Sequence, residues 1–432
     1  MKPALVIDTV GVVGAGLMGI GIAASFLLAG FRVRIVDVAE ELINKAKGSL
    51  RDILQSSISK MRGKVLLEEC LRRSSLSTSF DDFRTCQLVV EAVFENLKVK
   101  QDVFRKLSTI CSSTCLICTN TSSLDISDIA VDCSDPERIA GMHFFSPAHI
   151  MRLVEVVVTA STSDSTIRSI LDVVKRINKV GVVVRNNPGF VGNRMIFNYI
   201  LESMQLLEEG ASVEQVDRLM VDFGFPMGPF QMQDLSGLDV GYKIRMEAGL
   251  REPSMRYSKI GDALYELGRL GCKNGKGFYR YEQGSRVPLP DPAVEEILIQ
   301  FRRRDVDSPS DQEIRARLIY PLINEAFKIL ADGGVVSMRP GDIDAIFVLG
   351  YGWPSFTGGV LFYAQNFVGI RETKDALQAL SQRFPSSPYF TPAPILDPIL
   401  MKNISICEIQ SSPSIMRELS LNMMKNHPKS RL

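Results

Sequence analysis

The chain has 432 residues, 45% of them hydrophobic, and a formal net charge of +1. A chain of this length and apolar content can bury two or three cores, and its balanced charge gives no indication of nucleic acid as a partner. Its eight cysteines are scattered, which argues against a disulfide framework and indicates a reducing compartment.

A glycine-rich turn near the N-terminus is the first strong pattern. A β-rich run from Thr9 breaks on glycines and continues at helical spacing, which predicts a strand, a tight turn and a helix whose first N–H groups can bind a pyrophosphate. The next β-rich run ends in Asp37, at the distance at which such motifs place an acid for a ribose diol. The combination predicts an NAD site, and Asp37 favours NAD over NADP, although Arg32 and Arg34 weaken that preference. The residues expected to contact the cofactor are Gly14, Ala15, Gly16, Leu17, Met18, Gly19 and Asp37.

The uncharged stretch from Thr9 to Phe31 is also long enough to span a bilayer. Six glycines lie in it, and a charged strand follows at once. No other apolar stretch of similar length occurs, and the N-terminus lacks the pattern of a secretory signal. We therefore expect no membrane span.

Residues 40–64 are predicted to form a helical insertion in the nucleotide-binding domain, with an apolar face that includes Leu50 and Leu54. Basic residues such as Lys45 either meet a phosphate-bearing substrate or form a solvated face, and the second is the commoner case.

Polar residues follow three predicted strands. Leu88–Phe94, Leu116–Cys118 and Ile139–Phe145 are apolar runs, and Ser122 and His143 lie at or just beyond the ends of the last two. The carboxyl ends of parallel strands meet at one edge of a doubly wound sheet, where such folds bind ligands. That edge is the predicted active site.

His143 has a candidate partner in Glu155, which lies in a second apolar run. A carboxylate in such a run is costly to bury unless it is paired. If the two strands are neighbours, Glu155 can orient the imidazole and stabilise its charged form, as a carboxylate does for a general-base histidine. His149, in a loop after Pro147, is a weaker candidate.

The spacing of Cys111, Cys115 and Cys118 matches a three-cysteine iron–sulfur pattern. Cys118 lies inside an apolar strand, however, where a thiol behaves as a small hydrophobe. We expect no metal site.

The alternation of strands and helices ends near Arg185, which predicts a domain boundary. Asn193 follows in the first turn of a long predicted helix and either reaches across a cleft or caps that helix. Two later segments, Leu207–Gly228 and Leu330–Gly358, share one order of helices and Gly/Pro-rich turns, which suggests a duplicated helical unit. The predicted domains are a nucleotide-binding domain at 1–185, helical domains at 186–284 and 311–370 with a linker at 285–310 between them, and an irregular Pro/Ser-rich tail at 371–432.

These motifs resemble the 3-hydroxyacyl-CoA dehydrogenase family, and especially the dehydrogenase half of peroxisomal bifunctional enzymes. The resemblance runs from Asp8 to about Gly369. The matching segments are Gly14-Ala-Gly16-Leu-Met-Gly19, Val90-Glu-Ala-Val-Phe-Glu95-Asn-Leu-Lys-Val-Lys100, Asn120-Thr-Ser122-Ser123-Leu, His143-Phe-Phe-Ser146-Pro147, Pro188-Gly-Phe-Val-Gly-Asn193-Arg194, Met227-Gly-Pro-Phe230 and Gly350-Tyr-Gly-Trp-Pro354.

The resemblance implies hydride transfer from carbon 3 of an L-3-hydroxyacyl-CoA to NAD, in fatty-acid β-oxidation. It implies that His143 takes the hydroxyl proton with Glu155 as its partner, and that Ser122 and Asn193 hydrogen-bond the substrate. It also implies that the 40–64 insertion meets the CoA, which raises the expectation for Lys45. The further cofactor contacts that it implies are Glu95, Lys100, Ser122, Ser146 and Lys273.

Departures from the family pattern refine these expectations. The chain starts close to the glycine-rich turn at Gly14–Gly19, here called the dinucleotide cradle. Bifunctional relatives carry a hydratase domain before this cradle, so hydratase activity is not expected. Ser146 replaces an Asn of single-function relatives, and the terminal Ser430-Arg431-Leu432 resembles a peroxisomal import signal. A peroxisomal enzyme recognised by the import receptor is expected, with the cytoplasm as the alternative location. The second helical unit makes a monomer or weak dimer the expected state. The alternative functions are a catalytically silent NAD-binding protein and a dehydrogenase of a free hydroxy acid.

Overall fold

The computed structural model describes residues 6–58, 64–247, 257–412, 414–415 and 419. The chain forms two compact units, Met1–Gly192 with Gly333–Ser337, and Asn193–Asp332 with Met338–Leu432. The first unit therefore extends beyond Arg185, where the pattern of strands and helices ends.

One sheet of eight strands organises the first unit, in the order β3-β2-β1-β4-β5-β6-β7-β8. All neighbouring strands are parallel except β6 and β7, which are antiparallel. The predicted doubly wound sheet is confirmed, with β3 as a strand that the sequence pattern did not indicate. The strands are β1 (Thr9–Val13), β2 (Arg32–Val36), β3 (Ser74–Ser77), β4 (Leu88–Glu91), β5 (Leu116–Thr119), β6 (Ile139–Phe144), β7 (Leu153–Val158) and β8 (Val180–Arg185).

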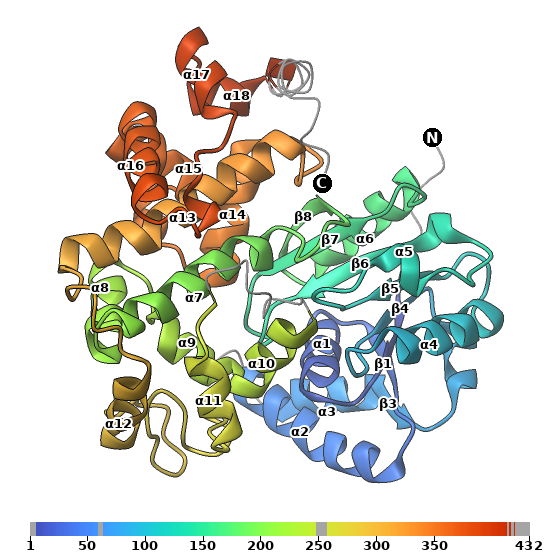
Figure 1. Ribbon diagram of the computed structural model, residues 1–432. Helices are drawn as coiled ribbons and strands as arrows, with labels where there is room; N and C mark the ends of the chain where they lie inside the picture. The colour runs from blue at the N-terminus through green and yellow to red at the C-terminus, as the bar shows by residue number, and fades with distance from the viewer. Residues whose placement is uncertain (1–5, 59–63, 248–256, 413, 416–418, 420–432) are drawn as a thin grey trace. The chain divides into compact units, whose positions relative to one another are not determined.

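Helices cover the sheet (Figure 1). Residues of α1, α2, α3 and α6 share one hydrophobic core with β1, β2, β4, β6 and β7. In the predicted helical insertion at 40–64, α2 extends to Ile58 and α3 begins at Lys64, and residues 59–63 lie outside the described part. The helices are α1 (Leu17–Leu28), α2 (Glu40–Ile58), α3 (Lys64–Arg73), α4 (Leu97–Ile110), α5 (Ile126–Ile129) and α6 (Asp164–Arg176).

A distant segment completes the edge of this sheet. Val335 forms an antiparallel bridge with Val184 of β8, and Val336 N donates to Val183 O at 3.0 Å. A strand edge otherwise presents unpaired N–H and C=O groups. Residues 333–337 therefore protect the β8 edge, although they lie between two helices of the second unit.

The second unit is helical. Its helices are α7 (Gly192–Glu208), α8 (Val213–Phe223), α9 (Pro229–Ser236), α10 (Leu238–Glu247), α11 (Ile260–Glu266), α12 (Pro292–Phe301), α13 (Asp311–Asp332), α14 (Pro340–Tyr351), α15 (Val360–Tyr363), α16 (Ile370–Arg383), α17 (Leu396–Lys402) and α18 (Ile406–Ser411). None of the helices within the described ranges has the length and apolar character needed to cross a bilayer.

The two similar segments share one packing device. Asp217 of α8 accepts hydrogen bonds from the first amides of α9, and Asp344 of α14 does the same for α15. A Cβ added at Gly228 would lie 2.2 Å from Asp217, and one added at Gly359 would lie 2.3 Å from Asp344. An aspartate thus contacts the glycine before the next helix in both cases, Gly228 at the end of the first segment and Gly359 directly after the second, which supports the interpretation of a duplicated unit.

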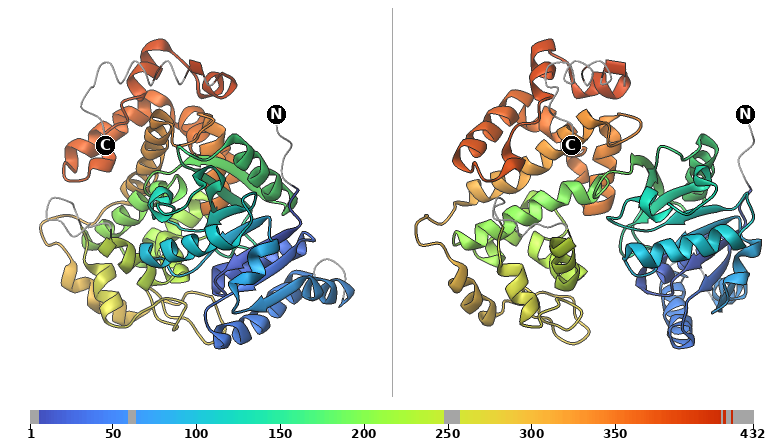
Figure 2. Two further views of the ribbon diagram at one scale, coloured as in Figure 1. Left: turned by 90° about the vertical axis from the view of Figure 1, so that its right-hand side faces the viewer. Right: turned by 45° about the vertical axis from the view of Figure 1, so that its right-hand side comes forward.

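The prediction of an irregular tail after residue 371 is wrong for the described residues. Figure 2 shows helices in the red part of the chain, where α16, α17 and α18 lie. The tail prolines of the described part fall between helices or in first turns, where a missing N–H costs little, so they do not prevent helix formation. Ser405 and Glu408 form a reciprocal capping box at the start of α18.

Candidate active site

The segment that leads from β1 into α1 requires glycine at two positions for packing reasons. Gly14 has φ +103°, and a Cβ there would lie 2.5 Å from the Ala92 carbonyl oxygen. A Cβ on Gly19 would lie 1.9 Å from the Gly14 carbonyl oxygen. These contacts bring the start of α1 against the end of β1, as a dinucleotide fold requires.

Gly16 has a different role, because a Cβ added there meets nothing within 4 Å. No side chain caps the N-terminus of α1, and Leu17 is 75% exposed. The described residues thus leave the space beside Gly16 open, as expected where a pyrophosphate approaches backbone N–H groups.

Asp37 lies directly after β2 and faces this turn. Its Oδ2 accepts a hydrogen bond from Ala15 N at 2.6 Å, and its Oδ1 accepts one from Val38 N at 2.7 Å. The carboxylate is thereby fixed beside the turn, where a ribose diol would be recognised. The cradle fits NAD on geometry and on charge.

His143 and Glu155 are directly opposite each other in the antiparallel pair β6 and β7. Glu155 Oε2 lies 2.8 Å from His143 Nδ1, and the two residues are 0% and 6% exposed. The predicted contact is confirmed. A buried carboxylate at Nδ1 leaves Nε2 as the ring nitrogen that can exchange a proton with a substrate.

The other oxygen of Glu155 holds the backbone that leads into α7. Its Oε1 accepts hydrogen bonds from Val191 N at 3.1 Å and from Gly192 N at 3.0 Å. Phe190, with φ 52°, packs its ring 5.5 Å from that of His143. This anchoring explains why the first unit continues to Gly192.

The loop after β5 is tied to both neighbouring strands. Asn120 Oδ1 accepts a hydrogen bond from Phe144 N at 2.8 Å, next to His143. Glu95 Oε1 accepts hydrogen bonds from the Thr121 hydroxyl and from Ser122 N, at 2.5 and 2.9 Å. Ser122 is therefore held at the edge of the sheet where β6 ends, as the sequence predicted.

A buried ion network supports Glu95. Lys100, 1% exposed, lies 2.7 Å from Glu91 Oε1 and 3.2 Å from Glu95 Oε2. Burial acts to raise the pKa of Glu95, but the Lys100 ammonium and the hydrogen bonds from Thr121 and Ser122 outweigh it and leave the pKa below its ordinary value. Lys100 thus meets two carboxylates within the protein, Glu91 and Glu95.

Sequence reasoning missed Glu91, which is 0% exposed. Besides Lys100, it accepts hydrogen bonds from the Thr119 hydroxyl and Val93 N, each at 2.7 Å. The available signal was a carboxylate in an apolar run, the same signal that identified Glu155.

The other predicted residues lie as follows. Ser146 is exposed after β6, and Lys45 is exposed on α2. Lys273 lies in the helical unit, 2.6 Å from Asp239 Oδ1. Ser430, Arg431 and Leu432 lie outside the described residues.

Asn193 lies in the first turn of α7, and its Oδ1 accepts a hydrogen bond from the hydroxyl of Tyr351 at the end of α14. Both residues belong to the second unit. This hydrogen bond joins α7 to α14 and does not cap α7.

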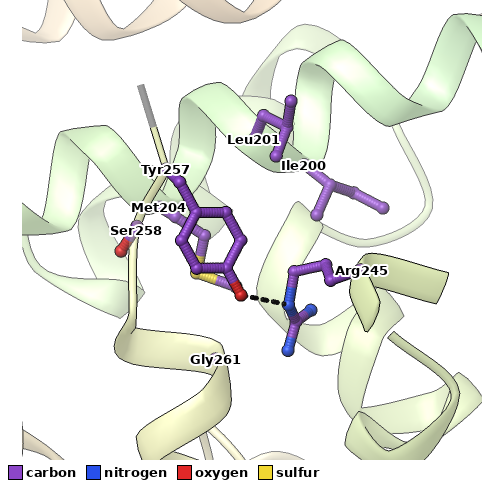
Figure 3. Close-up of a pocket in the computed structure, with 7 residues that line it drawn as sticks. All are labelled: Ile200, Leu201, Met204, Arg245, Tyr257, Ser258 and Gly261. Atoms are coloured by element: carbon purple, nitrogen blue, oxygen red, sulfur yellow. Dashed lines mark hydrogen bonds between the residues drawn. The ribbon is translucent and has the colours of Figure 1, made fainter. Parts of the chain in front are cut away.

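Cys118 is fully buried in β5, in keeping with its interpretation as a small hydrophobe. A cavity of about 10 Å³ in the helical unit, lined by Arg245, Tyr257 and neighbouring side chains (Figure 3), has room for about one water molecule and no more. It includes none of the predicted site residues.

The first unit joins a dinucleotide cradle to a His–Glu pair on one sheet, which is the construction of an NAD-dependent dehydrogenase. Residues 9–187 match the NAD-binding domain of 3-hydroxyacyl-CoA dehydrogenase, and residues 189–281 match the C-terminal domain of the same enzyme. The chain belongs to the 3-hydroxyacyl-CoA dehydrogenase family.

Relatives resemble the chain over most of its length. The peroxisomal bifunctional enzyme of Cavia porcellus is 41% identical over 402 residues, which cover 89% of this chain and 55% of the relative. That of Homo sapiens is 40% identical over 408 residues, 90% of this chain and 56% of the relative. The chain thus spans about half the length of the curated relatives it matches.

Two solved structures show the same fold. The dehydrogenase part of multifunctional enzyme 1 from C. elegans matches with a TM-score of 0.68 and 30% identity, over 91% of this chain and 90% of the other. The 3-hydroxybutyryl-CoA dehydrogenase of Escherichia coli matches with a TM-score of 0.77 and 25% identity, over 92% and 99%.

Proposed function

We propose that the chain oxidises L-3-hydroxyacyl-CoA to 3-ketoacyl-CoA with NAD, as a step of fatty-acid β-oxidation. The observation that carries the proposal is the buried pair of His143 and Glu155, 2.8 Å apart, on the sheet that also carries the dinucleotide cradle. Its family membership supports the same reaction.

In the proposed reaction the substrate loses a proton from its 3-hydroxyl group and a hydride from carbon 3. His143 Nε2 takes the proton, and the Glu155 carboxylate stabilises the resulting imidazolium. NAD, when bound, supplies the electrophilic carbon that accepts the hydride. Ser122 and Asn193 hydrogen-bond the substrate oxygen or the thioester, which orients the reacting carbon.

The remaining predicted contacts belong to the same proposal. Glu95, Ser146 and Lys273 contribute to cofactor binding, and Lys100 acts by holding Glu95. Lys45 on the exposed basic face of α2 meets the phosphates of CoA. The protein works in the peroxisome as a monomer or weak dimer, a location that the names of its relatives support.

A spectrophotometric assay of NADH oxidation tests the proposal, with acetoacetyl-CoA and longer 3-ketoacyl-CoA thioesters as substrates. We expect turnover with the thioesters, little with the free 3-keto acids, and a fall of about 10²-fold or more in His143→Ala. NADH binding without turnover would support the catalytically silent alternative. Equal rates with free acids would support the hydroxy-acid alternative.

Two further measurements test the finer parts. NADH formation from a 2-enoyl-CoA with NAD would contradict the expected absence of hydratase activity. Import into peroxisomes of a fluorescent fusion, compared with one lacking Ser430 to Leu432, tests the proposed location and its signal. Import of both proteins would leave the tripeptide without a role.

A further inference from the structure

Tyr351 belongs to the second of the two similar segments, Leu330–Gly358, which supplies none of the proposed catalytic residues. It is the last residue of α14, and Gly352 follows as a left-handed cap with φ 73°. Its ring lies 5.5 Å from that of Phe347, one helical turn earlier, and Phe347 is fully buried. The position of the hydroxyl is thus fixed by the helix end and by the packed ring.

The Tyr351 hydroxyl donates a hydrogen bond to Oδ1 of Asn193. An asparagine amide has one accepting end and one donating end, and rotation about its last torsion exchanges them. In this structure the hydroxyl donates to Oδ1, so Tyr351 engages the accepting end of the amide. The group of Asn193 that is then suited to a carbonyl or alkoxide oxygen is its NH2.

We infer that Tyr351 is a positioning residue for the dehydrogenase reaction, which acts by holding Asn193 in the orientation that donates to the substrate. The inference rests on the proposed function. It assigns the duplicated unit a part in catalysis through one hydroxyl group.

An internal comparison separates this role from packing. Tyr351 and Gly352 correspond to Phe223 and Gly224 in the first of the two similar segments, and Gly224 is likewise a left-handed cap, with φ 118°. Phe223, which has no hydroxyl group, is the last residue of its helix and packs against the rings of Phe225 and Trp353. The helix end therefore does not need the Tyr351 oxygen.

Other contacts also hold α7 against α13. Arg194, the neighbour of Asn193, lies 2.5 Å from both Glu325 and Asp332 of α13. Asn198, one turn later, lies 3.3 Å from Glu325. Loss of a single neutral hydrogen bond from Tyr351 should leave these ion pairs in place, so its main effect should fall on Asn193.

The test is a Tyr351→Phe variant of the full chain, assayed with NADH and acetoacetyl-CoA. We expect kcat to fall three- to tenfold, with the KM for NADH and the melting temperature unchanged. Tyr363→Phe is the matched control. The Tyr363 ring lies 5.6 Å from that of Trp353, which in turn lies 6.0 Å from the Phe347 ring against which Tyr351 packs. We expect the kcat of this variant to equal that of the wild type.

A double-mutant cycle with Asn193→Ala decides whether Tyr351 acts through Asn193. In the Asn193→Ala background, Tyr351→Phe should have no further effect on kcat. Wild-type kcat in Tyr351→Phe, or a further full-sized fall in the double variant, would overturn the inference while the proposed function stands. A wild-type chain that turns over no thioester would refute both.

Discussion

Glu155 joins His143 to the backbone at the start of α7. One carboxylate oxygen lies 2.8 Å from Nδ1 of His143, and the other accepts the amides of Val191 and Gly192. A single buried group therefore fixes both the proposed base and the chain segment that leads to Asn193.

Glu155→Gln should lower kcat with 3-ketoacyl-CoA by about 10²- to 10⁴-fold, by analogy with carboxylate loss in hydrolase triads. The glutamine oxygen can still accept from Val191 and Gly192, so its NH2 faces His143 Nδ1. That contact favours the tautomer with hydrogen on Nε2 and no longer stabilises the imidazolium. NADH oxidation rates and thermal melting together check this, and undiminished kcat in the folded variant would remove Glu155 from the mechanism.

Gly16→Ala and Gly19→Ala should separate cofactor binding from folding. A Cβ at position 16 meets no protein atom within 4 Å, whereas one at position 19 lies 1.9 Å from a carbonyl oxygen. We expect Gly16→Ala to melt like the wild type and to bind NADH at least tenfold more weakly. Gly19→Ala should lose several degrees of melting temperature. Fluorescence titration and calorimetry measure the two effects, and full NADH affinity in Gly16→Ala would contradict the cradle.

Lys100→Met should destabilise the fold by about 3–5 kcal/mol, because it leaves the Glu91 carboxylate buried without its cation. Lys98→Met, which removes an exposed pair with Asp102 whose partners are 73% and 46% exposed, is the control and should cost much less. Denaturant unfolding gives both values. The double variant Glu91→Gln/Lys100→Met, in which the carboxylate is also neutral, should recover part of the lost stability. Equal losses of stability in Lys100→Met and Lys98→Met would refute the buried ion network.

Asp344→Asn should have a pH-dependent effect on stability. Burial is the main cause that raises the pKa of Asp344 from 3.8 to about 7, so its contribution is largest at acid pH and is lost as the pH rises through 7. This pKa shift of about three units corresponds to at most about 4 kcal/mol of unfolding free energy. Asp344→Asn should therefore cost more stability at pH 5 than at pH 8, where the wild type carries a buried charge. Urea unfolding at both values checks this, and a constant difference would contradict it.

The cradle and the His–Glu contact could be predicted because each has a local signal. Gly14 and Asp37 stand at motif spacing, and Glu155 interrupts an apolar run that tolerates a carboxylate only if it is paired. Glu91 gave the same signal and was missed, because its partner Lys100 lies on the following helix, in a motif that suggested only a cofactor contact.

In the tail after residue 371 the sequence suggested too little structure. Proline and serine content suggested an irregular chain, yet Leu377, Phe390 and Ile399 are buried at 1% exposure or less. Helices of this length are stabilised mainly by the surface they pack against, and composition does not show that surface.

The sequence by itself determined the alternation of strands and helices in the first unit apart from β3, the dinucleotide cradle and the residue types of the proposed site, since turn glycines and buried charges are local constraints. Only the tertiary structure decided that Glu155 also holds the start of α7, that residues 333–337 complete the sheet edge, and that Tyr351 reaches Asn193. These contacts join residues 36 to 158 positions apart, and such distances are bridged by the packing of whole elements, which no local pattern specifies.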